Sequence, residues 1–242
     1  MNTTNNKILL TGGSSGIGLE MARRLKVLGN EVVVTGRSRQ KLEAVAKRYK
    51  LDIYQCDLSH QDQLEGLLDA INSQYKGVNM LINNAGVQYN YSFTGEVLFK
   101  DIEYEVDVNF NAVVKLCTAF VPLLMGHKES AIINVSSGLA LSPKKSAPVY
   151  CATKAGVHMF TKALRYQLEG SNIKVFEVLP PLVDTPMTKG RGKDKITPAQ
   201  LVDEFMIGLE RDRYEMNIGK VKLLKMMHRI SPAMADNILK ND

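Results

Sequence analysis

Tyr150 and Lys154 are the two side chains of this sequence best placed to do chemistry together. They stand four residues apart in Tyr150-Cys151-Ala152-Thr153-Lys154, and on a helix this spacing puts both side chains on one face. A free phenol has a pKa of roughly 10, so it exchanges protons poorly at neutral pH unless a neighbouring cation stabilises its phenolate. The pair is therefore a candidate for acid–base catalysis, although an ordinary surface pair has the same spacing.

A glycine-rich turn near the N-terminus is the second candidate. The apolar residues 7–11 predict a buried strand, residues 12–18 read Gly-Gly-Ser-Ser-Gly-Ile-Gly, and residues 19–28 predict a helix. A helix N-terminus that follows such a turn offers backbone N–H groups to a pyrophosphate. The spacing G-x-x-x-G-x-G fits neither G-x-G-x-x-G nor the P-loop, so a merely structural turn is the alternative.

The elements that must position these residues alternate along the chain. Apolar runs predict strands at 7–11, 31–36, 51–55, 78–82, 130–136 and 172–178, with a seventh at 214–218, and helical patterns lie between them. This alternation predicts an α/β fold: a single-domain, doubly wound parallel sheet of the Rossmann type with helices on both faces. Ligands bind such sheets beyond the carboxyl ends of the strands, and both candidate motifs follow a predicted strand there.

Composition limits the class of protein. The 242 residues suit one large domain, 45% of them are hydrophobic, and no segment approaches the ~20 apolar residues of a membrane span. The net charge of +6 is accounted for by an anionic cofactor, and no nucleic-acid motif is present. We expect a cytoplasmic protein without a signal peptide, disulfides or a metal site. The cysteines and histidines lack ligand spacing and are expected to be packed or at the surface; they are Cys56, Cys117, Cys151, His60, His127, His158 and His228.

Taken together, the motifs resemble the classical short-chain dehydrogenase/reductase family over nearly the whole chain. The matching residues, in family order, are Thr11-Gly12 to Gly18, Asp57, Asn83-Asn84-Ala85-Gly86, Asn109, Ser136-Ser137, Tyr150 with Lys154, and 180–185. Within the family, PVYCATK and PPLVDT are similar to the DltE-like group of oxidoreductases. The resemblance implies one domain over residues 1–242 that binds a nicotinamide cofactor, with residues 184–212 as the substrate lid region.

The resemblance also implies a set of cofactor contacts. Asp57 would hydrogen-bond the adenine amino group, while Ser59 is free to cap the next helix. Residues 83–86 would line the adenosine ribose, and Lys154 would bind the nicotinamide ribose. The implied set is Gly12, Ser14, Ser15, Gly16, Ile17, Gly18, Arg37, Asp57, Leu58, Asn84, Ala85, Gly86, Tyr150, Lys154, Pro180, Val183 and Thr185.

The residues after the second predicted strand favour NADP(H). An NAD-preferring enzyme has an acidic residue there to hold the ribose 2′-OH, whereas this chain has Gly36 followed by Arg37. A guanidinium suits a 2′-phosphate. Alternatively, Arg37 simply begins a solvated helix together with Arg39 and Lys41.

By the same resemblance, the catalytic residues are Asn109, Ser137, Tyr150 and Lys154. Ser137 lies thirteen positions before Tyr150 and would bind the substrate oxygen, with Ser136 as the alternative. Lys154 would lower the pKa of Tyr150. Asn109 would hold a water in a proton relay, with Asn111 as the alternative.

These residues predict an NADP(H)-dependent oxidoreductase that interconverts a small-molecule alcohol and carbonyl. A non-catalytic NADP(H)-binding regulator is the alternative, but it has no need of a proton relay. A sugar-nucleotide epimerase usually requires a larger substrate domain than the residues after Thr185 provide. The family usually has Pro-Gly where this chain has Pro180-Pro181, so the contacts of Val183 and Thr185 are less secure. Residues 188–197 are expected to form a flexible lid.

Two helical patterns, at 106–125 and 149–168, carry more apolar residues than one sheet-facing side requires. In the family such helices pair with their copies across a two-fold axis, so a homodimer or homotetramer is expected. The segment 221–230 mixes apolar and basic residues. Packing on the domain or a partner chain explains it as well as contact with a membrane does, and membrane contact is not expected.

Overall fold

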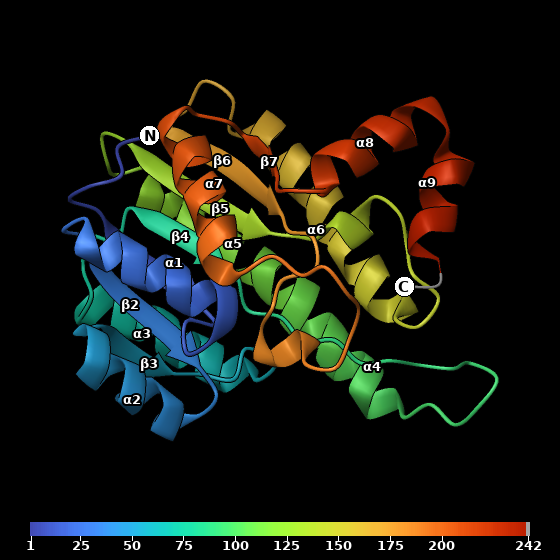
Figure 1. The fold of residues 1–242 in the computed structure, drawn as a ribbon. Coiled ribbons are helices and arrows are strands. Elements are labelled where there is room, and N and C mark those ends of the chain that lie inside the picture. Colours follow the sequence, from blue (N-terminus) through green and yellow to red (C-terminus); the bar gives the residue numbers. More distant parts are fainter. Residues whose placement is uncertain (241–242) are drawn as a thin grey trace.

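The predicted apolar runs form the strands of one parallel sheet in a computed structural model, which describes residues 1–240. The strand order is β3-β2-β1-β4-β5-β6-β7, and Figure 1 shows the sheet wrapped by helices. The predicted fold class is confirmed; the last two residues of the predicted domain, 241–242, lie outside the described residues. The strands are β1 (Lys7–Thr11), β2 (Glu31–Gly36), β3 (Asp52–Gln55), β4 (Met80–Asn83), β5 (Ser130–Val135), β6 (Ile173–Leu179) and β7 (Glu215–Asn217).

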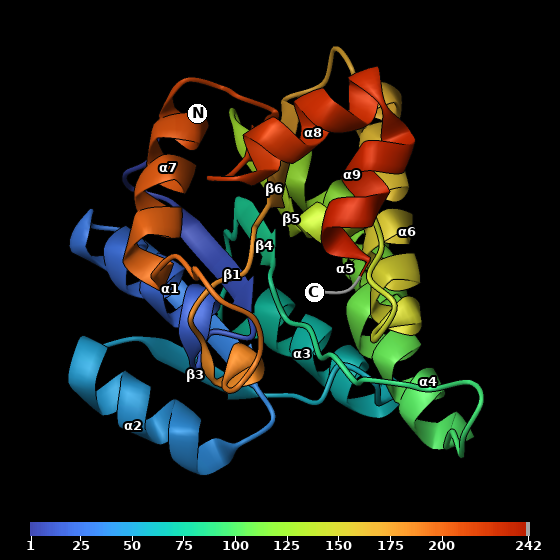
Figure 2. The same ribbon diagram turned by 45° about the vertical axis from the view of Figure 1, so that its right-hand side comes forward.

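Helices cover both faces of the sheet because successive strand residues point to opposite sides. On β1, Ile8 and Leu10 pack into a core with α1, α2 and α7, whereas Leu9 packs into a second core with α3, α5 and α6. Figure 2 shows these two helical layers on either side of the sheet. The helices are α1 (Gly16–Val27), α2 (Arg39–Tyr49), α3 (Gln61–Ser73), α4 (Phe99–Val106), α5 (Ala112–Leu124), α6 (Pro148–Gln167), α7 (Pro198–Glu210), α8 (Val221–Ile230) and α9 (Pro232–Leu239).

A π-helical turn at Asp107–Asn111 joins α4 to α5, so the chain runs helically from Phe99 to Leu124. This helix is long and apolar enough to cross a membrane by length and composition, which corrects the expectation that no segment approaches a span. Core helices meet the same criterion, and Leu116, Cys117 and Phe120 of α5 are buried in the core on one face of the sheet. The π-turn is of interest because such turns occur frequently at functional sites.

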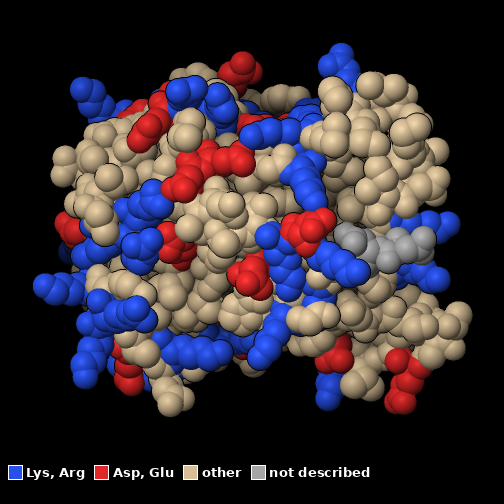
Figure 3. Space-filling view, in the orientation of Figure 1, with Lys and Arg blue, Asp and Glu red and all other residues tan. Residues whose placement is uncertain are grey.

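The C-terminal helices lie beyond the carboxyl end of the sheet, beside α6 (Figure 2). Val221 and Leu224 of α8 are buried, and α9, which the sequence analysis did not predict, is tied to the loop before α6 by a hydrogen bond from the Lys145 amide to the Lys240 carbonyl. Figure 3 shows a largely uncharged area over these two helices. The exposed apolar side chains there are Leu223, Met226, Ile230, Met234 and Ile238.

Candidate active site

A cleft of about 860 Å³ opens at the carboxyl ends of the strands, where the fold class predicts a ligand site. The whole implied cofactor-binding set lines this cleft, and so does Ser137; Asn83, at the start of the segment 83–86, is instead buried and donates to Asn134 Oδ1 at 2.8 Å. The far wall is apolar and comes from α8 and α9, through Leu223, Leu224, Met227, Ile238 and Leu239. Asn109 is not part of the lining; it is fully buried behind it.

The glycine-rich turn is fixed against the loop after β4. The Asn84 side-chain amide donates to the Thr11 and Gly12 carbonyls, at 3.0 and 3.2 Å. Gly18 has no room for a side chain, because a Cβ there would lie 2.3 Å from the Gly12 carbonyl oxygen. Gly12 has a φ of +71°, which a residue with a side chain rarely adopts.

The turn leaves the N-terminus of α1 open to an anion. α1 begins at Gly16, and its first turn carries no acidic side chain. Within residues 1–240 the Ser15 side chain makes no capping hydrogen bond. The first N–H groups of a helix have no intrahelical acceptor and bind phosphate well. The twelve-residue helix and the cleft in front of it therefore fit a pyrophosphate.

The β2–α2 turn forms the other wall of this half of the cleft. The Arg37 guanidinium donates a hydrogen bond to the Tyr104 hydroxyl, and its Cζ atom lies 5.4 Å from the centre of the Tyr104 ring. The Tyr104 hydroxyl also donates to Asp57, 3.2 Å from Oδ2. Tyr104 could not be identified as a site residue from the sequence, because nothing in the α4 sequence shows that this helix approaches the turn after β2.

The capping expected of Ser59 is wrong. The N-cap of α3 is His60, and the Ser59 hydroxyl and amide both donate to Asp57 Oδ1, at 2.9 and 3.1 Å. Asp57 is therefore held in an Asx-type turn and by Tyr104, rather than left without partners. Its carboxylate still borders the cleft.

Tyr150 and Lys154 project from α6 into the other half of the cleft, as the four-residue spacing predicts. Lys154 is 4% exposed, and its Nζ donates to the Val135 carbonyl at 2.8 Å and lies 5.8 Å from the centre of the Tyr150 ring. Burial lowers the pKa of Lys154 to about 8, against a smaller opposing effect of the Glu177 carboxylate.

The expectation that Lys154 lowers the pKa of Tyr150 is not met. Burial raises the pKa of Tyr150 to about 12, and the main opposing effect is a hydrogen bond with Ser137. The reason is geometric, since the ammonium is directed at a backbone carbonyl rather than at the phenol oxygen. Tyr150 therefore holds its proton at neutral pH, and burial makes it a weaker acid than a free phenol.

Asn109 lies in the π-turn and contacts two segments of the site. Its side-chain oxygen accepts from the Val87 amide at 2.8 Å, and its amide group donates to the Val87 carbonyl at 2.9 Å. A Cβ at Gly86 would lie 3.2 Å from Asn109 Oδ1 and 3.6 Å from Lys154 Nζ, so both side chains lie on the Cβ side of Gly86. Asn111, the alternative, instead bonds Asp107 at 2.7 Å within its own helix.

The two serines after β5 have different surroundings. Ser137 starts a short helical turn, and its hydroxyl accepts from the Leu139 amide at 3.1 Å. The Ser136 hydroxyl donates to the buried carboxylate of Glu177 on β6, which also contacts His158. Ser137 is therefore the serine associated with Tyr150. Glu177 was not foreseen, although a carboxylate inside an apolar strand was visible in the sequence.

The loop after β6 reaches the cleft in spite of Pro181. The Gly138 amide donates to the Pro180 carbonyl at 2.8 Å, Val183 is buried and bridges to Ile196, and Thr185 approaches Gly16 closely. In the predicted lid region, 184–212, residues 198–210 form α7, which packs on α1 as part of the core. The segment before α7 borders the cleft through Met187, Gly192, Lys193 and Asp194.

The fold and this cleft define a doubly wound α/β protein with a dinucleotide-sized site at its switch point. A model of the short chain dehydrogenase family matches residues 6–196. The oxidoreductase DltE of Bacillus subtilis is 43% identical over 235 residues, which cover 93% of this chain and 92% of that protein. The chain belongs to the short-chain dehydrogenase family, a class of oxidoreductases, and the similarity to the DltE-like group is confirmed.

Solved structures agree with this assignment. The short-chain dehydrogenase from Sphingobium yanoikuyae in complex with NADPH matches with a TM-score of 0.82 at 26% identity over 96% of both chains. The 3-ketoacyl-(acyl-carrier-protein) reductase from Brucella melitensis, complexed with NADH, matches with a TM-score of 0.80 at 26% identity, covering 86% of this chain and 91% of that one. Within residues 1–240, no group of three His, Cys, Asp or Glu side chains could hold a metal ion.

Proposed function

We propose that this protein is an NADP(H)-dependent oxidoreductase that interconverts an alcohol and a carbonyl. The observation that carries the proposal is that Ser137, Tyr150 and Lys154 line the same cleft as the glycine-rich turn and the N-terminus of α1. A dinucleotide bound at that N-terminus would extend toward Tyr150. When bound, its nicotinamide would supply or accept the hydride.

The residues of this chain would perform the proton chemistry. Ser137 orients the substrate carbonyl through a hydrogen bond, and Tyr150 donates its phenolic proton to the carbonyl oxygen. A phenol with a pKa of about 12 carries the proton at neutral pH, and the hydrogen bond with Ser137 partly offsets the effect of burial that makes it a weaker acid. The Lys154 ammonium supplies the proton that restores the Tyr150 phenol, and Asn109, whose Oδ1 lies beside Gly86 as Lys154 Nζ does, would hold a water of the proton relay.

The adenine half of the cleft favours NADP(H) over NAD(H). Arg37 stands directly after Gly36, and the guanidinium is fixed by Tyr104 at the mouth of the cleft. Arg39, which follows in α2, is instead paired with Glu43 at 2.7 Å. A fixed guanidinium loses less conformational entropy when it binds a phosphate. The related solved structures hold NADPH in one case and NADH in the other.

Turnover of a panel of aldehydes and ketones tests the proposal. Purified protein is mixed with NADPH or NADH, and the loss of reduced cofactor is followed by absorbance. We expect turnover with at least one carbonyl and a higher kcat/KM for NADPH. Tight binding of NADPH without turnover of any carbonyl in the panel would favour the regulatory alternative instead.

A further inference from the structure

A buried polar contact lies behind Lys154 and has no part in the mechanism above. Glu177 of β6 is 1% exposed. Its carboxylate accepts a hydrogen bond from the Ser136 hydroxyl, and its two oxygens lie 3.0 and 2.9 Å from His158 Nδ1. The three side chains come from three neighbouring elements, namely the end of β5, β6 and α6.

A carboxylate in this buried position lowers the stability of the fold, which indicates that it is kept for a functional role. Burying a charge in the sheet requires hydrogen bonds and an opposite charge to offset its lost hydration, and an apolar residue would fill the position without that cost. The two partners of Glu177 are both adjacent to catalytic candidates. Ser136 directly precedes Ser137, and His158 lies one helical turn after Lys154 on α6.

Glu177 and Lys154 are joined through the end of β5: Ser136, which donates to the Glu177 carboxylate, directly follows Val135, whose carbonyl accepts from Lys154 Nζ. The Lys154 ammonium donates to the uncharged Val135 carbonyl, so the hydrogen bond it makes within the protein provides no counter-charge. Burial lowers the pKa of Lys154 to about 8, and the Glu177 carboxylate raises it. The hydrogen bond with Glu177 raises the pKa of His158, although burial opposes this. A protonated His158 would offset part of the Glu177 charge and so weaken the effect of Glu177 on the pKa of Lys154.

We propose that Ser136, Glu177 and His158 form a positioning unit for the Lys154 ammonium. In this unit the Glu177 carboxylate stabilises the charged ammonium, and a protonated His158 weakens that stabilisation. Ser136 holds the carboxylate at the end of β5. This inference rests on the proposed function, since the charge of Lys154 matters because it serves Tyr150.

Other charged groups facing this unit do not replace Glu177. Glu215 of β7 is paired with Lys225 of α8, and their effects on the pKa of His158 are opposite in sign. Arg165, farther along α6, donates to the Val175 carbonyl of β6 at 2.8 Å and to the Tyr214 carbonyl at 3.0 Å. On the cleft side, Tyr150 is neutral below its pKa of about 12.

Two near-isosteric substitutions distinguish this role from simple packing. Glu177→Gln removes the negative charge, so we expect the pKa of Lys154 to fall by about one unit. His158→Asn keeps a donor near the position of Nδ1 but cannot carry a positive charge, so we expect the pKa of Lys154 to rise. The alkaline limb of kcat/KM for carbonyl reduction would move with it, to lower pH in the first variant and to higher pH in the second.

The pKa of Lys154 is measured directly by competitive acetylation across a pH series, with the labelled peptide quantified by mass spectrometry. This readout needs no substrate, so it tests the positioning unit even if no carbonyl is turned over and the proposed function fails. Glu129→Gln is the matched control, because it removes a carboxylate that pairs with Lys174 just before β5. We expect no change in the Lys154 titration in this control.

Circular dichroism establishes whether each variant is folded. If Glu177→Gln does not fold, His158→Asn still tests the proposal. A Lys154 pKa that falls in Glu177→Gln and rises in His158→Asn supports the positioning unit, and shifts of the reversed signs contradict it. A titration that stays unchanged in either folded variant, or moves in the same direction in both, overturns it.

Discussion

At the scale of single residues, the site combines a phenol that keeps its proton with an amine that is ready to lose one. The pKa of Tyr150 is about 12 and that of Lys154 about 8, and burial is the main cause of both shifts. Burial favours the neutral form of each group, which raises the pKa of an acid and lowers that of an amine. Proton return from Lys154 to a Tyr150 phenolate is therefore downhill.

Removing one oxygen atom tests this arrangement. Tyr150→Phe keeps the ring and deletes the proton donor, so we expect kcat for carbonyl reduction to fall by at least ~100-fold while NADPH affinity is nearly unchanged. Steady-state kinetics and equilibrium fluorescence titration with NADPH measure the two quantities. Tyr166→Phe is the control, because Tyr166 lies on the same helix and is 64% exposed. Retention of more than a few per cent of the activity in Tyr150→Phe would rule out the proposed role.

At the scale of elements, each parallel strand delivers one segment to the cleft where it ends, so a change at one strand end alters one part of the ligand. The turn from β2 to α2 borders the part of the cleft that would hold the adenosine end of the cofactor. Gly36 has an ordinary φ, and a Cβ there would lie 3.2 Å from the Ser14 hydroxyl. A side chain at position 36 is therefore accommodated by a small movement of Ser14.

Replacing the positive charge of the β2–α2 turn with a negative one is expected to change the cofactor preference. The double variant Gly36→Asp and Arg37→Ala loses a charge-assisted contact with the 2′-phosphate, worth roughly 1.5–3 kcal/mol, and gains a repulsive carboxylate. The ratio of kcat/KM for NADPH to that for NADH is expected to fall by at least ~10-fold. Arg39→Ala, which only disrupts the surface pair with Glu43, is expected to leave the ratio unchanged. Equal use of both cofactors by the unmodified protein would contradict the premise.

At the scale of the whole molecule, α5 and α6 present apolar side chains away from the sheet. Met125 of the α5 C-cap and Met159 and Tyr166 of α6 are 46, 63 and 64% exposed. A two-fold contact between copies of these helices would cover them. These side chains therefore define the surface through which the predicted homodimer or homotetramer would form.

Light scattering tests this assembly. We expect a dimeric or tetrameric mass at micromolar concentration, and we expect Met159→Glu to shift the population toward monomer because it buries a charge in the contact. Val27→Glu is the matched control, since Val27 is 75% exposed on α1, away from these helices. A monomeric mass for the unmodified protein would show that the contact does not form.

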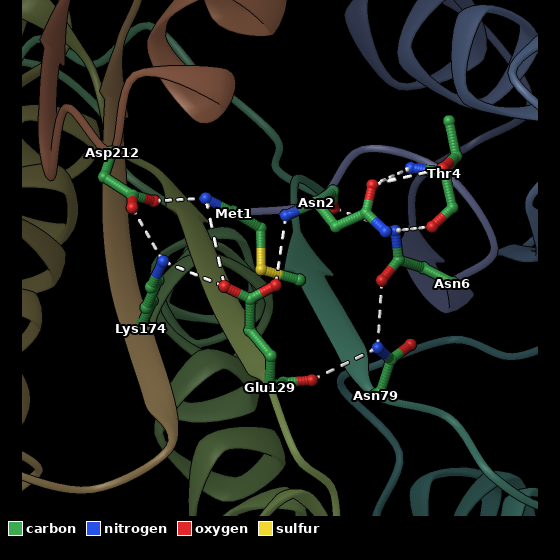
Figure 4. A network of polar contacts seen from close by, with 8 residues as sticks. All are labelled: Met1, Asn2, Thr4, Asn6, Asn79, Glu129, Lys174 and Asp212. Atoms are coloured by element: carbon green, nitrogen blue, oxygen red, sulfur yellow. Dashed lines mark hydrogen bonds and ion pairs between the residues drawn. The ribbon is translucent and has the colours of Figure 1, made fainter.

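An ion-pair network near the N-terminus joins distant parts of the chain. Lys174 of β6 contacts Glu129 at 2.9 Å and Asp212 at 2.7 Å, and Figure 4 shows the terminal amine of Met1 between the same two carboxylates. The hydrogen bond from Lys174 lowers the pKa of Glu129. Burial raises the pKa of Asp212, but bonds from Lys174 and the terminal amine outweigh it, so this pKa is also lowered.

These lowered pKa values predict an acid-sensitive contribution to stability. The contribution is present above the pKa values that these carboxylates have in the unfolded chain, about 4. It is lost as pH falls through their lower pKa values in the folded protein. Because the groups are partly exposed, Lys174→Met is expected to lower the free energy of unfolding by only about 1 kcal/mol at neutral pH. Urea denaturation across a pH series measures this. A difference between variant and unmodified protein that does not shrink in acid would show that Lys174 acts through packing alone.

The fold class and most of the cleft could be predicted from residue order. Strand and helix periodicity depends on local residue order, and the carboxyl ends of parallel strands meet at one edge of the sheet. The sequence was therefore enough to predict that the glycine-rich turn, Asn84, Ser137 and Tyr150 lie near one another. Contacts between elements far apart in sequence could not be read in this way. Tyr104 reaches Arg37 across the cleft, and Glu177 joins Ser136 to His158.

The protonation of the site was likewise decided by tertiary structure. The sequence places Tyr150 and Lys154 on one face of a helix, but it does not show that the ammonium is directed at the Val135 carbonyl or that burial is the main influence on both pKa values. A pKa depends on desolvation and on charges from every surrounding element. Local spacing therefore identifies which groups meet, whereas three-dimensional packing decides which of them hold a proton.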